Sequence, residues 1–254
     1  TLEIRNNNNQ LINTISSARD SLYRQWDGGP PPAAILSKKN GLNRFVWDLR
    51  HPIMSGIPDT YIEASFKGHR AIPGTYKLIL TVGEKNISTN AIITENPLYE
   101  MQPGQYSAYH NIMNSMEANL TAMHDMVNAL FNANNQIKEI VSSLDAIKHE
   151  NLIKKGTQLI EHLTIWDGEM IQRKSKAYDD VENFPNKFTA EYIFLINQTE
   201  SSIPRVNDQN RSRKISLDAQ WKSFENSGNN FLNNEIPNFN RLLWEAGIGA
   251  IKIN

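Results

Sequence analysis

Cysteine is absent from the 254 residues, and its absence excludes three kinds of feature at once. Without thiols the chain has no disulfides, no thiolate metal ligands and no cysteine nucleophile. Long apolar runs are also missing, since a run such as Tyr192–Ile196 is far shorter than the roughly 20 residues that a membrane-spanning helix needs. We therefore expect a fold stabilised by packing alone, with no membrane span.

An excess of charge of one sign is missing as well. The 26 lysines and arginines nearly balance the 27 aspartates and glutamates, which gives a net charge of −1. Because the two signs are interspersed, the molecule has no overall field that would steer it toward polyanions. We expect no nucleic-acid partner.

The signatures of catalytic, cofactor and metal sites are not found either. The sequence contains no G-x-S-x-G elbow, no P-loop and no dinucleotide fingerprint. Its six histidines are scattered, and no two of them form H-x-H or H-x-x-x-H: His51, His69, His110, His124, His149 and His162. Transition-metal ligands usually come in such close pairs. We therefore predict no catalytic residue, no cofactor and no metal site.

What the sequence does have is enough apolar material for a packed core, with 39% hydrophobic residues and five tryptophans. A chain of this length suits two domains. It begins at Thr1, without a methionine or a signal-like segment, which is typical of a processed protein or of a fragment of a longer one. We expect a globular protein of the α+β class.

Residues 1–97 carry the signals of a β domain. Short β-branched and aromatic runs alternate with turn residues, and the runs that we interpret as strands are Leu2–Arg5, Leu11–Ile15, Asn43–Arg50, Gly74–Val82 and Ile87–Thr94. Two long connections, at 26–32 and 51–60, contain several prolines and glycines and cannot be regular strands. This pattern favours an immunoglobulin or fibronectin-III-like β-sandwich.

The run Asn43–Arg50 raises the question of whether it is a site or a strand. Its alternation predicts that Phe45, Trp47 and Leu49 face the core. Asp48 and Arg50 then share the opposite face, where we interpret them as ion-pair partners on the surface or between domains. His51 follows at the strand end, and we interpret it as a local hydrogen-bonding residue.

Residues 98–254 change to a helical period and predict an up-down helical bundle. A helix of about 40 residues begins near Tyr109, and its seam is Met113, Met116, Leu120, Met123, Val127, Leu130, Ile137, Val141 and Leu144. Asn134 interrupts this seam, either as a packing specifier or as a buried ligand-binding amide. Further helices are expected at 149–176, 188–202 and 217–246, with a kink or break at Pro237 and a left-handed cap at Gly247. The polar segment 207–214 is predicted to be a mobile loop.

Four blocks of the sequence resemble a known family. They are "WDGGPPP" at 26–32, "GLNRFVWDLRHP" at 41–52, "GHRAIPGTYKLILTVG" at 68–83 and "EIPNFNRLLWEAG" at 235–247. The chain is similar to the C-terminal immunoglobulin-like and helical region of bacterial BNR/sortilin-type β-propeller proteins, which are often labelled glycosyl hydrolases. The P-G-T-Y-K-L strand is also similar to the immunoglobulin-like domain of flagellar hook-capping proteins. The resemblance implies an exported protein with a propeller upstream of these residues, and places any hydrolase apparatus in that propeller.

Three functional hypotheses follow. The first is a non-catalytic accessory module, with a β-sandwich at 1–97 and a helical bundle at 98–254, that caps or positions the propeller. The second is a contribution to a glycoside hydrolase through loops around Trp26 and Arg70, and the third is helical oligomerisation through the methionine-rich seam. The residues that we expect to contact carbohydrate or a protein partner are Trp26, Asp27, His51, His69 and Arg70. For Trp26, packing against its own domain is the alternative.

Overall fold

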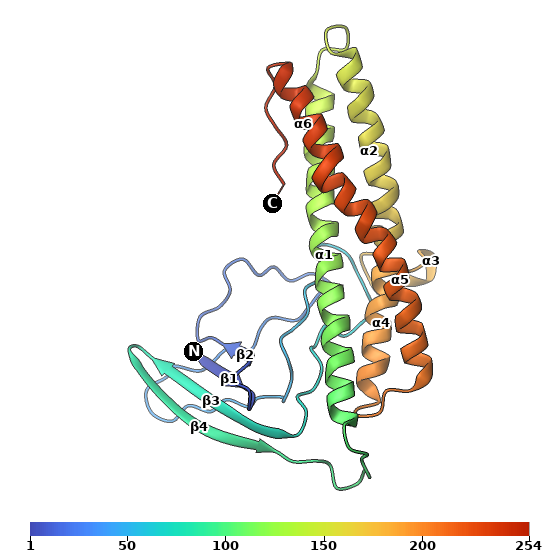
Figure 1. Cartoon of the computed structure of the whole chain (residues 1–254). Helices are drawn as coiled ribbons and strands as arrows, with labels where there is room; N and C mark the ends of the chain where they lie inside the picture. Colours follow the sequence, from blue (N-terminus) through green and yellow to red (C-terminus); the bar gives the residue numbers. More distant parts are fainter. Residues whose placement is uncertain (254) are drawn as a thin grey trace.

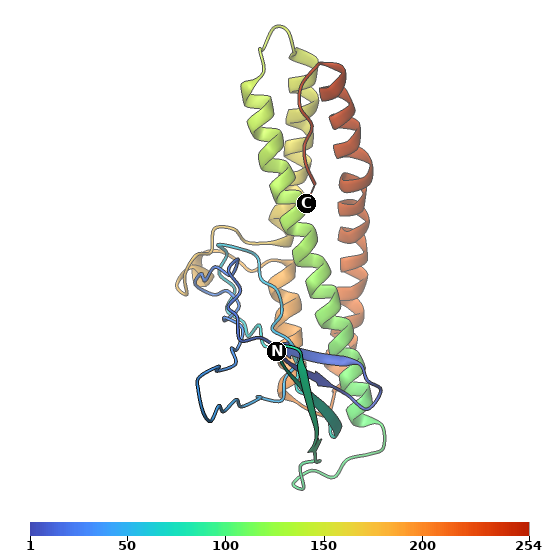
Figure 2. The same ribbon diagram turned by 90° about the vertical axis from the view of Figure 1, so that its left-hand side faces the viewer.

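The computed structural model describes residues 1–253 and has an α+β fold. A four-stranded antiparallel sheet lies beside the lower half of a tall column of helices, and the upper half of that column extends away from the sheet (Figure 1). The view turned by 90° shows the sheet against the same lower part of α1 (Figure 2). None of the helices in the described residues has the length and apolar character needed to cross a bilayer.

The sheet consists of the two hairpins that the sequence predicts. Its strands are β1 (Leu2–Arg5), β2 (Leu11–Ile15), β3 (Gly74–Val82) and β4 (Lys85–Ile93), in the order β2-β1-β3-β4. Neighbouring strands are all antiparallel, with Ile4 opposite Leu78 and Leu80 opposite Ile87. A positive φ of 58° at Gly83 forms the tight β3–β4 turn.

The predicted strand Asn43–Arg50 is wrong. This segment has no regular pairing apart from one bridge at Arg50, and Leu49 takes a left-handed φ of 58°, which interrupts an extended chain. Phe45 and Trp47 nevertheless pack onto the sheet core, as their spacing predicts, whereas Leu49 is exposed. Trp47 donates its indole N–H to the Arg50 carbonyl at 3.0 Å. Phe45 and Trp47 therefore face the sheet core although the segment does not pair as a strand.

One face of the sheet is covered by this irregular chain instead of by a second sheet. The sheet core consists of Ile4, Ile12, Ile15, Ala71 and Tyr76, with Leu2, Leu36, Phe45, Trp47, Leu78 and Ile93 packed against it. Trp47 meets Tyr76 edge to face, with ring centroids 5.6 Å apart. Only one sheet is present among residues 1–253.

The helical part is built around α1. Its helices are α1 (Gln105–Ser143), α2 (Glu150–Met170), the short α3 (Asp180–Asn183), α4 (Phe188–Ser201), α5 (Asp208–Asn230), the π-helix η1 (Phe231–Glu235) and α6 (Ile236–Glu245). α2 and α4 follow one another along α1, while α5, η1 and α6 form one continuous column beside them (Figures 1 and 2). The arrangement differs from a row of separate up-down helices because α2 and α4 run in the same direction.

The predicted α1 seam is confirmed over most of its length. Its fully buried residues are Tyr109, Met113, Met116, Leu120, Met123, Val127, Leu130 and Ile137, whereas Val141 and Leu144 are half-buried. Asn134 is buried and donates from Nδ2 to Thr164 Oγ1 of α2 at 3.1 Å. This hydrogen bond fits a packing specifier. The seam is occupied by helices of the same chain.

The polar segment 207–214 is not a loop, and its prediction is wrong. Asn207 caps α5 by accepting a hydrogen bond from the Asn210 N–H at 2.7 Å, and helix follows directly. Polarity here reflects an exposed helix start and not the absence of structure.

Pro237 neither breaks nor ends the C-terminal helix. The backbone widens into η1 immediately before it, with the Ile236 N–H donating to the Phe231 carbonyl, five residues back. A π-turn removes the clash between the proline ring and the preceding turn. The predicted cap at Gly247 is confirmed, with φ 72° and hydrogen bonds from Gly247 to Trp244 and from Ile248 to Leu243.

The helical core also takes in part of the N-terminal half. Met54, Ile57, Ile62 and Phe66 are buried in the same cluster as the helix residues. The segment 54–66 thus belongs by packing to the helices, although it precedes residue 97. The domain boundary at 97 remains a prediction, and hydrophobic burial crosses it.

Two glycines of α2 give a matched stability test. A Cβ at Gly156 would lie 2.5 Å from Val141 Cγ2 and 2.9 Å from Phe239 Cζ, whereas a Cβ at Gly168 meets nothing within 4 Å. Alanine favours helix by about 1 kcal/mol, while overpacking costs about 1–3 kcal/mol. We expect urea unfolding to show Gly156→Ala destabilised by about 1 kcal/mol and Gly168→Ala stabilised by about 0.5 kcal/mol. Equal values for both variants would contradict the close approach at Gly156.

Candidate functional site

The first candidate site lies where two irregular segments of the N-terminal half meet α1 and α4. Arg50 and Arg70 form an isolated antiparallel bridge, flanked by hydrogen bonds from the His51 N–H to the His69 carbonyl at 2.9 Å and from the Ala71 N–H to the Leu49 carbonyl at 2.7 Å. Side chains alternate across such a ladder. The two arginines therefore share one face and the two histidines share the other.

The arginine face binds a glutamate of α4. Glu200 Oε1 lies 3.2 Å from Arg50 Nη1 and 3.3 Å from Arg70 Nε, and Arg50 also donates to the Gly68 carbonyl at 2.9 Å. Arg50 is thus an ion-pair partner between the N-terminal half and the helices, as predicted. Its partner is Glu200, whereas Asp48 makes no ion pair among the described residues.

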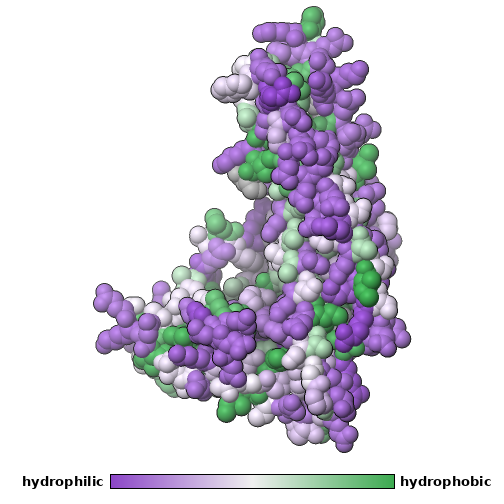
Figure 3. Space-filling model, viewed as in Figure 1, coloured by the Kyte–Doolittle hydropathy of each residue, from purple (hydrophilic) through white to green (hydrophobic). Residues whose placement is uncertain are grey.

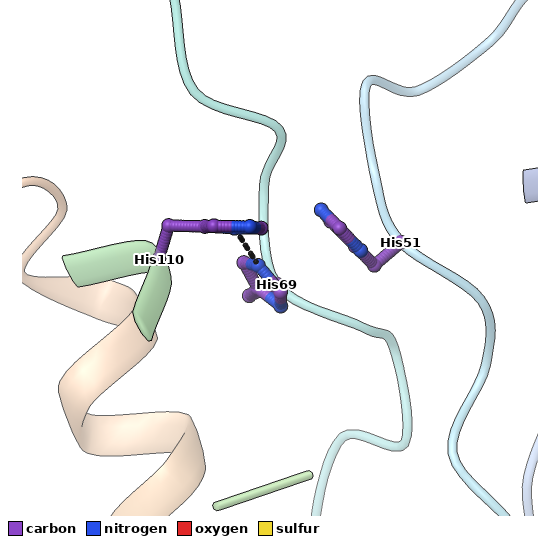
Figure 4. A group of neighbouring side chains, drawn as sticks. All are labelled: His51, His69 and His110. Atoms are coloured by element: carbon purple, nitrogen blue, oxygen red, sulfur yellow. Dashed lines mark hydrogen bonds between the residues drawn. The ribbon is translucent and has the colours of Figure 1, made fainter. Parts of the chain in front are cut away.

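The histidine face forms a cluster of three imidazoles, His51, His69 and His110, which we call the histidine cluster (Figure 4). His69 is fully buried, and its ring stacks on His51 with centroids 3.8 Å apart and planes 15° apart. His69 Nε2 lies 3.0 Å from His110 Nδ1, the contact that is dashed in Figure 4. The three residues come from two loops and from the first turns of α1.

Glu117 of α1 fixes the orientation of His69. Its Oε2 lies 2.9 Å from His69 Nδ1, and its Oε1 accepts the His69 backbone N–H at 2.7 Å. Because a carboxylate only accepts, Nδ1 must carry the proton, and Nε2 is left facing His110. On the far side of His110, Nε2 lies 2.9 Å from Asn114 Nδ2.

Burial favours the neutral form of two of these imidazoles, His51 and His110. Desolvation, followed by the neighbouring His69 and His110, lowers the pKa of His51 to about 3. Desolvation and then His69 also lower the pKa of His110, against an opposing effect of Glu117. Both rings are therefore neutral at pH 7, and neutral imidazole nitrogens are hydrogen-bonding groups or metal ligands.

Trp26 and Asp27 lie apart from this cluster. The Trp26 indole N–H donates to the Thr60 carbonyl at 3.0 Å, and its ring packs closely against Gly29 and Gly56. Trp26 thus ties the two long loops of the N-terminal half together, while Asp27 is exposed. Of the five predicted contact residues, the structure brings together His51, His69 and Arg70 only.

Three further residues of the site were missed from the sequence: His110, Glu117 and Glu200. His110 and Glu117 are seven residues apart on α1, so they share a helix face two turns apart, and this is the signal that could have linked them. No spacing rule links His51 to His69, because loop geometry alone brings them together.

A second candidate site is an open groove of about 630 Å³ at the end of the sheet next to Thr1, which we call the terminal groove. Its apolar lining is Leu2, Leu36, Phe45, Leu80 and Val82. Val82 is 63% exposed, although it continues the buried face of β3. Apolar and hydrophilic residues are interspersed over the region of the sheet in the space-filling view (Figure 3).

Comparison with known proteins adds no relative, since no family model, no curated protein and no solved structure matches the chain.

Proposed function

We propose that this chain is a non-catalytic module that positions a preceding domain of the same exported polypeptide. That domain is a β-propeller of the BNR/sortilin type, as the resemblance of the four sequence blocks implies. The terminal groove carries the proposal, because it offers an unfilled apolar surface beside Thr1, where a preceding domain would be attached.

The sheet face explains why this groove suits a protein surface. Along β3 the side chains of Tyr76 and Leu78 are covered by the chain's own core, whereas Leu80 and Val82 on the same face are exposed. Ile87 of β4, opposite Leu80, is also 66% exposed. Burying such a row beneath another domain gains about 25 cal/mol for each Å² of apolar area.

On this proposal, the sheet and the irregular chain that covers it are the counterpart of the immunoglobulin-like sandwich, and residues 98–254 are a second, helical domain. The ion pairs of Glu200 with Arg50 and Arg70 hold the two parts together. A rigid joint of this kind would set the orientation of the propeller relative to the helices.

Hydrogen exchange on the isolated chain and on the full polypeptide tests the proposal. We expect the amides of residues 36–45 and 80–83 to exchange at least tenfold more slowly in the full polypeptide, and Val82→Glu to abolish this protection. Ile92→Glu is the matched control, because Ile92 is 73% exposed but pairs with Thr75 on the opposite face of the sheet. Equal exchange in the two proteins, or turnover of aryl glycosides by the isolated chain, would refute the proposal.

A further inference from the structure

We propose that the histidine cluster is a transition-metal site in which His51, His69 and His110 are the ligands. One ring nitrogen from each residue lies within 4.8 Å of those of the other two. The proposal is independent of the function proposed above, since it concerns the joint with α1 and not the terminal groove.

The nitrogen spacing suits a tetrahedral ion. Zinc binds imidazole nitrogen at about 2.0–2.1 Å, so two ligands of a tetrahedral site lie about 3.3 Å apart. His69 Nε2 and His110 Nδ1 are 3.0 Å apart and point at each other, so binding an ion requires them to separate by a few tenths of an ångström and to turn toward the shared ion. His51 must in addition tilt out of its stack on His69, so that its nitrogen turns toward the other two.

The surroundings of His69 are those of a metal ligand. Metal-bound histidines usually donate their other N–H to a carboxylate, which fixes the tautomer and makes the ligand more basic. Glu117 occupies this position at His69 Nδ1, and it is anchored by the His69 backbone N–H. If the hydrogen bond between His69 and Glu117 served only to stabilise the fold, it would require no further imidazole beside it. The ring of His51 nevertheless stacks on the ring of His69.

His110 has a comparable partner in Asn114. When Nδ1 of His110 binds a metal, its proton moves to Nε2, which then faces the Asn114 amide. Rotating that amide by 180° presents Oδ1 as the acceptor. An open groove lined by His110 and Asn114 reaches the His110 side of the cluster.

The donor set selects the class of metal. Three imidazoles without a carboxylate or carbonyl ligand favour Zn²⁺, Cu²⁺, Ni²⁺ or Co²⁺ over Mg²⁺ and Ca²⁺, which require oxygen donors. The three ligands leave a fourth position for water. Since they come from two loops and α1, a bound ion would lock the N-terminal half onto the helices.

Titration of the tag-free, EDTA-treated chain with Co²⁺ and Zn²⁺ tests the site. We expect one Co²⁺ per chain, with the visible absorption of tetrahedral cobalt, displacement by one equivalent of Zn²⁺, and a rise in Tm on Zn²⁺ binding. His51→Gln and His110→Gln each remove one ligand, and we expect each to weaken Zn²⁺ binding at least tenfold. Glu117→Gln keeps all three ligands, and we expect it to weaken binding by about 10–100-fold.

His162→Gln is the matched control, because His162 is an exposed histidine on α2 outside the cluster. We expect this variant to bind Zn²⁺ as the parent does. Circular dichroism verifies that each variant is folded, and having two separate ligand variants keeps the test decisive if one of them unfolds. The absence of a saturable one-to-one cobalt spectrum would overturn the proposal. So would an equal loss of binding in His162→Gln and His110→Gln, or full affinity in His51→Gln.

Discussion

Gly68→Ala is expected to lower the free energy of unfolding by about 3 kcal/mol, at the upper end of overpacking substitutions. A Cβ at this position would lie 2.3 Å from the Pro52 carbonyl oxygen and 2.6 Å from that of His51. Both are backbone atoms, so no side-chain rotation relieves the contact. The segment 51–52 would have to move away by about 1 Å to reach an ordinary contact distance of 3.4 Å.

This movement opens the ladder that carries the site. Gly68 is buried next to His69, and its carbonyl accepts the hydrogen bond from Arg50. Urea unfolding measures the loss of stability, and a crystal structure of the variant would show His51 separated from His69. Gly249→Ala is the control, since a Cβ there meets nothing within 4 Å. A stability within 0.5 kcal/mol of the parent would show that the two segments are not packed this tightly.

The sequence predicts the regular elements well because each depends on a local period. The two hairpins and the α1 seam are marked by alternation over a few residues and by a heptad-like stripe, and both give the correct elements. The errors in the predicted elements occur where tertiary contacts determine the local structure. Alternation in Asn43–Arg50 buries Phe45 and Trp47 correctly, but no neighbouring strand is available to pair with the segment.

The candidate site was less predictable than the fold. The histidine cluster joins residues 18 and 41 positions apart, from two loops and one helix, and no sequence period connects such positions. Arg50 was predicted to form an ion pair, because the alternation places it with Asp48 on the face opposite the core-facing residues. That the partner is Glu200, on α4, depends on the docking of the two halves. The spacing of residues in a sequence therefore predicts sites that lie within one helix or strand better than sites whose residues come from several segments.

The docking of the halves also makes stability depend on pH through His124 of α1. His124 is fully buried, and its Nδ1 lies 2.8 Å from the Ser55 carbonyl in the loop that packs on the helices. A carbonyl only accepts, so Nδ1 carries the proton and Nε2 has no hydrogen-bond partner among the described residues. Burial lowers the pKa of His124 to about 4 from its usual 6.5, against the opposing effect of the Ser55 hydrogen bond.

Because the pKa of His124 is lower in the folded state, the unfolded chain binds a proton at His124 below about pH 6.5. The folded chain binds this proton only below about pH 4. Stability is therefore fully present above pH 6.5 and is lost as the pH falls to 4, by about 3 kcal/mol from this residue at 1.36 kcal/mol per pKa unit. Urea unfolding at a series of pH values in EDTA measures this slope.

His124→Asn separates this effect from other acid-sensitive groups, including His51, whose lowered pKa acts in the same direction. The asparagine amide nitrogen takes the place of Nδ1 and still donates to Ser55, but it does not titrate. The variant loses packing volume and is less stable at pH 7, yet between pH 6.5 and 4 it should lose about 3 kcal/mol less than the parent. If the free energies of unfolding of the parent and the variant fell equally with pH, the ring of His124 could be protonated in the folded state. Water would then reach the contact between Ser55 and α1.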